Sequence, residues 1–295
     1  MKCQGLDTME HKQKKAMGTL YIVATPIGNL EDITFRAARV LKEVDLIAAE
    51  DTRHTRKLLS AFGIQTPLTS LFDRNERGKS GMIVSRLREG QDVAYVSDAG
   101  TPGISDPGYV LINAAIDAGV TIVPVPGVSA VVTALCVSGL PMDSFVFYAF
   151  LPHAGGKKRN LIESLRSEKR TMIFYDSPKR IMETLEIVKE AMGNERRIVV
   201  ARELTKIHEE IIRGSVAEAI QSLENREIKG EITLLVSGAE EDKVISEDDI
   251  RMRYDELHKD RTLTTKDIIN IITDETGVSR KEVYKVIIQQ VRGKG

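Results

Sequence analysis

Short apolar runs alternate with longer amphipathic stretches over residues 19–126, and this alternation constrains the fold more than any other feature of the chain. The apolar runs predict strands over 20–24, 46–49, 93–96 and 121–125. Helices predicted over 80–89 and 107–118 end at Gly90 and Gly119, since glycine readily takes the left-handed conformation just past a helix end. Strands separated by helices run parallel in a sheet covered on both faces. The first half of the chain is therefore predicted to be α/β.

A second pattern starts near Pro126 and Gly127. Its predicted strands lie close enough in sequence for several to pair antiparallel, and they cover 145–150, 171–175, 197–201, 209–213 and 232–236. Helix starts are predicted at Ser177-Pro178 and at the capping box Ser215 to Glu218, then at Ser246 and Ser279 in a region without strands. The predicted organisation is a leader without fixed structure (1–17), an N-terminal α/β domain (18–126), a C-terminal α/β domain (127–239) and a helical tail (240–295).

Composition narrows the class of protein. The 295 residues are 42% hydrophobic with a formal net charge of −1, so bulk charge gives no sign of a partner that is a polyanion. No apolar stretch reaches the roughly 18 residues that a membrane span needs. The two cysteines, Cys3 and Cys136, are too few for a disulfide framework or a zinc site. We expect a cytoplasmic protein with no membrane span and no metal centre.

Four loops that follow predicted strands predict a small-molecule cleft. They are residues 25–29, 98–107 and 126–130 and the stretch after Tyr175. In the second loop, Gly100 and Gly103 allow the backbone to approach a ligand closely, and Asp106-Pro107 is typical of a helix N-cap followed by a first-turn proline. A single turn of this kind usually only connects two elements, but several at the carboxyl edge of a sheet favour a binding site. No dinucleotide or P-loop glycine motif occurs.

Residues 50–56 concentrate carboxylates, cations and an imidazole after a predicted strand. One interpretation is a solvated helix start capped by Asp51 or the threonine after it. The other is a functional cluster in which Arg53 and Arg56 hold phosphates. In that case the residues able to accept a proton are Glu50, Asp51 and His54. The sequence leaves both interpretations open.

The most basic stretch of the chain starts at Lys157, Lys158 and Arg159 and follows an aromatic run. Cations beside aromatic rings are typical of an RNA contact. Charge runs on helices are as often solvated faces, so RNA contact is only one of two interpretations here.

Five segments together resemble the tetrapyrrole-methylase superfamily and, within it, the bacterial enzymes that methylate a cytidine 2′-oxygen of 16S ribosomal RNA. The segments are GTLYIVATPIGNLEDIT at 18–34, AEDTRHT at 49–55, VSDAGTPGISDPG at 96–108, FYDSP at 174–178 and ARELTK at 201–206. The resemblance covers roughly residues 18–238. Departures occur at the run 71–76, which lacks the usual tyrosine and histidine, and at Val128 and Lys179.

The resemblance implies two α/β domains with S-adenosylmethionine in the cleft between them, a homodimer, and a substrate cytidine in the decoding centre of the 30S subunit. By motif it assigns the cofactor to Ile27, Asp98, Gly100, Thr101, Gly103, Ile104, Ser129, Ala130, Tyr175, Arg202, Gly230 and Glu231. By position, the resemblance implies that five residues face the RNA: Gly28, Glu50, Arg53, His54 and Lys157. The charged clusters add Arg56, Lys158 and Arg159 to this set.

The implied reaction is attack of a ribose 2′-oxygen on the sulfonium methyl carbon, with Glu50, Asp51 or His54 as the hypothetical base. Two alternatives remain. One is another methyltransferase of the superfamily, acting on a corrin precursor or on a translation factor. The other is a non-catalytic RNA-binding assembly protein. The helical tail is interpreted as a helix-turn-helix-like RNA or dimer element, or as a packing accessory.

Overall fold

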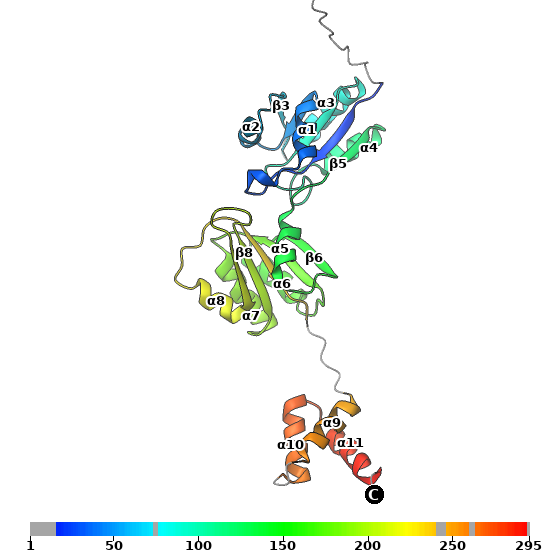
Figure 1. Ribbon diagram of the computed structural model, residues 1–295, viewed down its shortest axis with the longest axis vertical. Coiled ribbons are helices and arrows are strands. Elements are labelled where there is room, and N and C mark those ends of the chain that lie inside the picture. Colours follow the sequence, from blue (N-terminus) through cyan, green and yellow to red (C-terminus); the bar gives the residue numbers. More distant parts are fainter. Residues whose placement is uncertain (1–15, 73–75, 240–245, 260–262, 294–295) are drawn as a thin grey trace, which may run out of the picture. The chain divides into compact units, whose positions relative to one another are not determined.

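A computed structural model describes residues 16–72, 76–239, 246–259 and 263–293 (Figure 1). Residues 1–15 of the predicted leader lie outside this part of the chain. The chain divides into two compact units, one extending to Ala239 and one from Glu240 onward, and each is described by itself. The first unit holds two five-stranded sheets.

The first sheet is entirely parallel, with the strand order β3-β2-β4-β1-β5. Its strands are β1 (Thr19–Val23), β2 (Leu46–Ala49), β3 (Leu68–Ser70), β4 (Val93–Val96) and β5 (Thr121–Val125). The four predicted strands are confirmed. The edge strand β3 was not predicted, because three residues are too few to show an apolar pattern.

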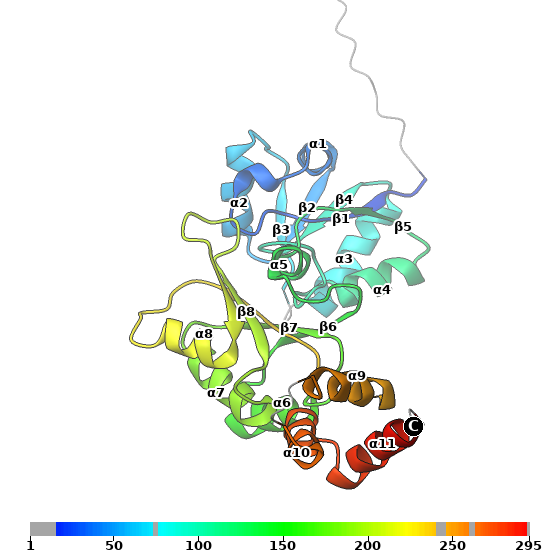
Figure 2. The ribbon, with the colours of Figure 1, turned by 60° about the horizontal axis from the view of Figure 1, so that its bottom comes forward.

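Helices cover both faces of this sheet, as parallel pairing requires. Four helices do so: α1 (Phe35–Glu43), α2 (Thr52–Ala61), α3 (Glu76–Arg88) and α4 (Tyr109–Asp117). One core cluster joins α1 and α2 to one face, and a second joins α3 and α4 to the other. Figure 2 shows α1 on the opposite side of β1 and β4 from α3 and α4. A short 3-10 helix, η1 (Leu30–Asp32), follows β1.

The start of α4 differs from the prediction. Asp106 is not its N-cap; that position is Gly108, whose backbone φ of 132° suits glycine and which has no side chain to cap the helix. Instead Glu76 Oε1 accepts hydrogen bonds from the backbone N–H groups of Gly108, Val110 and Leu111 at 2.9, 3.0 and 3.2 Å. A buried carboxylate from α3 therefore satisfies the free donors at the start of α4.

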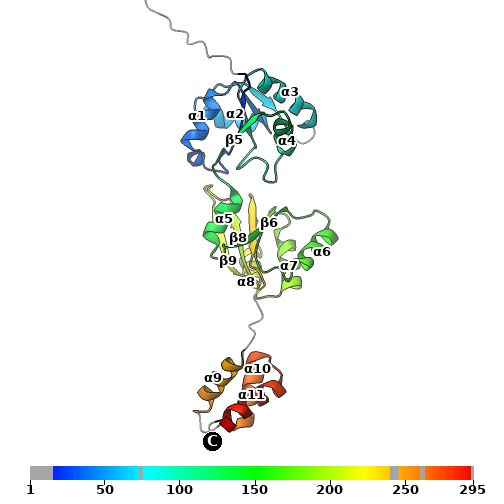
Figure 3. The same ribbon diagram turned by 90° about the vertical axis from the view of Figure 1, so that its right-hand side faces the viewer.

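The second sheet has the order β6-β7-β10-β8-β9; β6 and β7 are parallel and the other pairs antiparallel. The strands are β6 (Phe145–Phe150), β7 (Thr171–Asp176), β8 (Arg197–Arg202), β9 (Glu210–Ser215) and β10 (Ile232–Val236), all predicted to within two residues at either end. Three helices pack on one face: α6 (Gly155–Ser164), α7 (Ile181–Met192) and α8 (Val216–Leu223). Helix α5 (Ala130–Ser138) packs on the other (Figure 3).

Two helix starts of this half test the capping predictions. The capping box of Ser215 and Glu218 is present at the start of α8. The prediction at Ser177-Pro178 is wrong by a turn: α7 starts at Ile181, because residues 178–180 form a turn first. That turn returns Arg180 toward the end of β7, where it meets Asp176.

The second unit is a small helical bundle of α9 (Glu247–Leu257), α10 (Thr265–Thr276) and α11 (Arg280–Gly293). Apolar side chains from all three helices form its core, among them Ile250, Ile268 and Ile287. Helices α9 and α10 each begin with a complete capping box, of which the one at Ser246 was predicted. No helix in the described part of the chain combines the length and apolarity that crossing a membrane requires.

Candidate active site

A cleft lies at the carboxyl edge of the first sheet, where three strands, β4, β1 and β5, are neighbours. After β1 the chain continues to α1 on one face of the sheet, and after β4 it continues to α4 on the other face. The loops after these two neighbouring strands therefore leave toward opposite faces, and a crevice remains between them. The loops are nevertheless joined at their base. Thr25 and Gly100 exchange two backbone hydrogen bonds of 2.9 and 3.0 Å. Thr101 Oγ1 donates to the carbonyl of Val128 at 3.0 Å, which holds the third loop beside them.

The cleft encloses about 750 Å³, part of it open to solvent, which lies within the range of small-molecule sites. All four predicted loops contribute to its wall, and the start of β10 in the second sheet completes it. The lining residues are Ile27, Ala99, Gly100, Thr101, Ile104, Ser105, Asp106, Ser129, Ala130, Phe150, Tyr175, Asp176, Glu231, Ile232 and Thr233.

The charged side chains that line the cleft are carboxylates, at Asp106, Asp176 and Glu231. Two of them also have cationic partners outside the lining: Asp176 pairs with Arg180 at 2.9 Å, and Glu231 pairs with Lys206 at 3.2 Å. Burial raises the pKa of Tyr175 to about 12, and the negative charges of Asp106 and Glu231 add to that rise. Two phenylalanine rings, Phe147 and Phe150, stand edge-on to Tyr175 with centroids 5.0 and 5.3 Å away, so the phenol is held in place.

Eight of the residues that the sequence assigns to a cofactor line this cleft: Ile27, Gly100, Thr101, Ile104, Ser129, Ala130, Tyr175 and Glu231. Gly100 adopts φ of +76°, and a methyl group there would lie 3.3 Å from Ile27 Cγ2. The absence of a side chain at Gly100 therefore leaves space beside Ile27 in the cleft wall.

The other four assigned residues lie outside the lining of the cleft. Asp98 Oδ1 accepts from the backbone N–H of Asp51 at 2.9 Å. Gly103 is an exposed loop residue with positive φ. Arg202 is tied to Glu210 at 3.0 Å, and Gly230 leaves room for the side chain of Glu203 beneath the strand end.

Seven lining residues were not predicted: Ala99, Ser105, Asp106, Phe150, Asp176, Ile232 and Thr233. Thr233 carried a signal, because it is the single polar residue of an apolar strand and is buried. It pairs across the sheet with Tyr175, so both side chains face the same side. Asp176 also carried a signal, because it directly follows Tyr175 in the segment FYDSP at 174–178.

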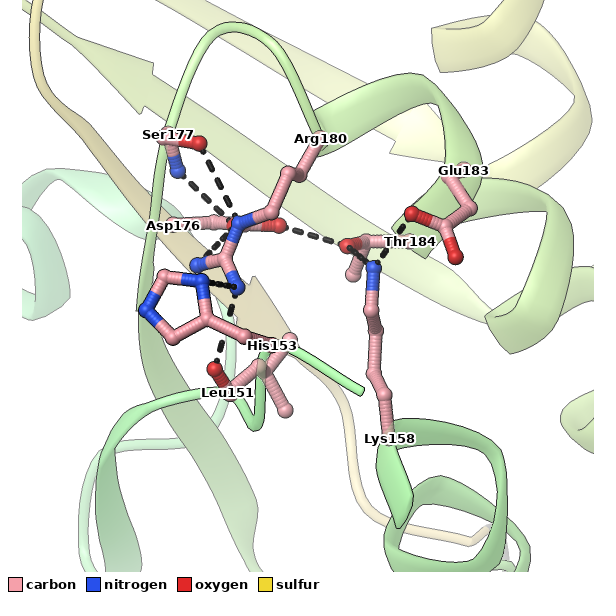
Figure 4. A network of polar contacts seen from close by, with 8 residues as sticks. All are labelled: Leu151, His153, Lys158, Asp176, Ser177, Arg180, Glu183 and Thr184. Carbon is pink, nitrogen blue, oxygen red and sulfur yellow. Dashed lines mark hydrogen bonds and ion pairs between the residues drawn. The ribbon is translucent and has the colours of Figure 1, made fainter. Parts of the chain in front are cut away.

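A polar network surrounds Asp176 at the edge of the cleft (Figure 4). Its carboxylate, which is fully buried, pairs with Arg180 at 2.9 Å and accepts from Thr184 Oγ1 at 2.5 Å. Arg180 also donates to the carbonyl of Leu151 at 3.2 Å and lies 3.3 Å from Nδ1 of His153. The network therefore ties the segment after β6 to the end of β7 and fixes one side of the cleft mouth.

The charged cluster at 50–56 lies beside the cleft and does not line it. Asp51 is the N-cap of α2, as one interpretation predicted, and its side chain accepts from the N–H of Arg53 at 2.8 Å. The guanidinium of Arg53, hydrogen-bonded to the same carboxylate, lowers the pKa of Asp51 to about 2. Glu50 Oε2 lies 3.4 Å from the backbone nitrogen of Asp98, and His54 is exposed in the first turn of α2.

The basic segment divides between the surface and the core. Lys158 is wrongly assigned to the RNA: its side chain is fully buried, and its ammonium pairs with Glu183 at 2.8 Å (Figure 4). Arg159 is exposed and paired with Glu190, and Lys157 is exposed. The helical phase of α6 explains the difference, because successive residues point about 100° apart.

Two other residues assigned to the RNA lie apart from each other. Gly28 packs under the segment after β8, where a methyl group would lie 2.4 Å from Lys206 Cγ. Arg56 is exposed at a separate hollow that it shares with Ile64 and Pro67. The structure therefore brings Glu50, Asp51 and the cleft loop together, and leaves Arg56 away from them.

Comparison with known proteins decides the family. Residues 19–220 match the family described as Tetrapyrrole (Corrin/Porphyrin) Methylases. The chain belongs to this methylase family. The predicted fold, two α/β sheets with a cleft and a helical tail, is thereby confirmed.

This methylase has relatives named Ribosomal RNA small subunit methyltransferase I. The one from Halalkalibacterium halodurans is 43% identical over 95% of this chain and 98% of its own. The one from Synechocystis is 44% identical over 92% of this chain and 98% of its own. The one from Thermotoga maritima is 49% identical over 76% of this chain and 100% of its own, so the rest of this chain has no counterpart in it.

Among solved structures, the methylase resembles a uroporphyrin-III-C-methyltransferase from Thermus thermophilus with a TM-score of 0.52, at 22% identity over 75% of this chain and 94% of that chain. The methyltransferase CobJ gives a TM-score of 0.57 at 21% identity over 75% and 95%. These likenesses concern the fold.

Proposed function

We propose that this methylase transfers the methyl group of S-adenosylmethionine to the 2′-oxygen of a cytidine ribose in 16S ribosomal RNA. The observation that carries the proposal is one cleft whose wall comes from both sheets and whose titratable groups are carboxylates and a tyrosine. The names of the relatives, at 43–44% identity over 92–95% of this chain, support small-subunit ribosomal RNA as the substrate, and the cytidine 2′-oxygen is what the resemblance of the motifs implies.

The residues of the cleft fit this cofactor. S-adenosylmethionine, when bound, supplies a methyl group on a positively charged sulfur, already activated for transfer. Asp106 and Glu231 provide the negative charge that suits such a cation, and the backbone at Gly100 leaves room for a close approach. Ile27 and Ile104 provide an apolar surface on the same wall.

The chain contributes alignment and a base. Effective molarities of about 10⁵ to 10⁸ M are available when reacting atoms are held in line. A base removes the hydroxyl proton, the ribose oxygen forms its bond to the methyl carbon, and the electrons of the broken carbon–sulfur bond stay on sulfur. The hydrogen bond with Arg53 lowers the pKa of Asp51 to about 2, which makes it a weaker base than an ordinary carboxylate. Glu50 lies beside the loop that forms the cleft wall, and His54 is an exposed residue in the first turn of α2.

The proposal extends to the state and place of action: a homodimer that acts on 30S subunits in the cytoplasm. Two exposed apolar side chains support self-association, Phe35 at 99% and Ile207 at 97% exposure. A hydrogen bond of 3.1 Å between Asn29 N and Thr205 Oγ1 joins their two segments. Sedimentation velocity of Ile207→Asp against the unchanged chain tests the dimer; an unchanged mass would remove this support.

The experiment is transfer of a labelled methyl group from S-adenosylmethionine to 30S subunits that lack the modification, followed by nuclease mapping. Label on a cytidine 2′-oxygen is expected. Glu50→Gln and His54→Ala are assayed separately. The base is the residue whose variant loses kcat with little change in cofactor affinity. If both retain full turnover, neither residue is the base.

A matched pair of glycine variants tests the cleft. Gly100→Ala and Gly63→Ala place a methyl group at similar positive φ angles, +76° and +63°, but only the first has cleft atoms nearby. Both variants should lose similar stability, and only Gly100→Ala should weaken cofactor binding. Cofactor binding without transfer to 30S subunits would move the substrate to a corrin precursor or an elongation factor. Subunit binding without cofactor affinity would favour the non-catalytic assembly protein.

A further inference from the structure

Helices α10 and α11 of the second unit form a helix-turn-helix. Gly277 ends α10 with a φ of 69°, and only two further residues precede Arg280, the first residue of α11. A short glycine-containing turn of this kind joins the two helices of nucleic-acid-binding modules. Val283 and Ile287 of α11 are buried in the core against α10, and this fixes which face of α11 meets the solvent.

The solvent face of α11 is basic and aromatic. Arg280, Lys281 and Lys285 are exposed there, and Tyr284 between them is 54% exposed. The spacing of one, four and five residues places all four side chains on one side of the first two turns. In the docking geometry of helix-turn-helix modules, the start of the second helix is the part that reaches the nucleic acid.

The cations of α11 and those of α9 differ in their ion pairing within the described residues. Arg251 and Arg253 of α9 are paired with carboxylates at 2.6–2.9 Å. Within the described residues, Arg280, Lys281 and Lys285 have no carboxylate within ion-pair distance. Three hydrated cations around a half-exposed ring suit phosphates and an unstacked base better than they suit an apolar protein groove.

We propose that the first two turns of α11 form an RNA-binding face that holds phosphates of the substrate RNA and stacks one base on Tyr284. The identity of that RNA as 16S ribosomal RNA rests on the proposed function. In this proposal the face adds affinity for the substrate RNA, and the methyl transfer takes place at the cleft of the first unit.

The test uses the full chain and measures affinity for 30S subunits and for protein-free 16S RNA across a range of salt concentrations. The variant R280Q/K281Q/K285Q is compared with R251Q/K259Q/K266Q, which removes three cations from other positions of the same unit. Each lost phosphate contact lowers the slope of log affinity against log salt by about 0.7 to 0.9. We expect a decrease of about 2 to 3 for the α11 variant, no such decrease for its control, and unchanged S-adenosylmethionine affinity in both.

Tyr284→Ala separates stacking from charge: it should lower affinity by roughly 5- to 150-fold with the salt slope unchanged. Equal effects of the two triple variants, or an unchanged slope in the α11 variant, would overturn the proposal. A slope change seen with 30S subunits and absent with protein-free RNA would overturn it in favour of a protein contact. If no methyl transfer occurs but the slope change does, the proposed function fails and the RNA-binding face stands.

Discussion

Removing the carboxylate of Glu76 should loosen the start of α4 and, with it, the loop that forms the cleft wall. In Glu76→Ala the backbone N–H groups of Gly108, Val110 and Leu111 lose their shared acceptor. Gly108 and Leu111 are buried, so water cannot easily replace it. The same loop end is held from the other side by Tyr95, whose hydroxyl donates to the carbonyl of Pro107 at 2.7 Å.

The expected cost follows from these contacts. Losing a helix cap costs about 0.5–2 kcal/mol, and each buried donor left unsatisfied costs about 1–3 kcal/mol. For two such donors, with partial relaxation, we expect Glu76→Ala to lose about 3–5 kcal/mol of unfolding free energy. Glu76→Gln retains an acceptor oxygen and loses only the charge, so about 1–2 kcal/mol is expected, since charged hydrogen bonds are roughly twice as strong as neutral ones.

The assay combines urea unfolding, amide hydrogen exchange at residues 108–111 and titration with S-adenosylmethionine. Glu218→Ala is the control, because Glu218 also caps a helix through Ser215 N at 2.7 Å but is exposed and lies outside the cleft. That variant should lose about 1 kcal/mol and keep full cofactor affinity. The reasoning is refuted if Glu76→Ala is no worse than the control, or if its amides exchange as slowly as in the unchanged chain.

Two further predictions concern ion pairs. The pKa of Asp51 is lowered chiefly by its hydrogen bond with Arg53, so the stabilising effect of this pair is present above pH 4 and is lost as the pH falls toward 2. The difference in unfolding free energy between the unchanged chain and Asp51→Asn should therefore shrink over that interval. A difference that does not depend on pH would contradict this cause. In the pair of Lys158 and Glu183 the lysine side chain is 0% exposed and the glutamate 55%. Glu183→Ala should therefore leave a buried ammonium without its partner and lower the free energy of unfolding by about 3–5 kcal/mol. Lys158→Met leaves a carboxylate that water can solvate and should lower it by less. Thermal unfolding of both variants measures the two losses, and equal or reversed losses would show that the asymmetry of burial is unimportant.

The sequence predicted what local pattern controls. Apolar runs located nine of the ten strands in the described part of the chain, because burial selects their residues directly. The capping boxes at Ser215 and Ser246 could also be predicted, because the two partners of each box are only three residues apart in the sequence. The convergence of four loops also followed, since the carboxyl ends of parallel strands share one edge.

Long-range contacts were out of reach of such patterns. Glu76 caps a helix whose N-cap residue, Gly108, lies 32 residues later, so its role leaves no local trace, and the sequence favoured Asp106 as the cap. Lys158 finds Glu183 25 residues away, and nothing in a run of three cations tells which one turns inward. The roles of the assigned site residues stay predictions until binding and kinetics test them.

Each sheet of the first unit is built from one continuous stretch of chain, β1 to β5 before residue 126 and β6 to β10 from 145 to 236. During synthesis, the first sheet can complete its hydrogen bonding while the second is still inside the ribosome. The cleft, in contrast, needs Tyr175 and Glu231 to Thr233, which emerge much later. A nascent chain therefore completes the wall of this cleft only after residues 231–233 have emerged, and a chain truncated before them carries the folded first sheet without the complete cleft.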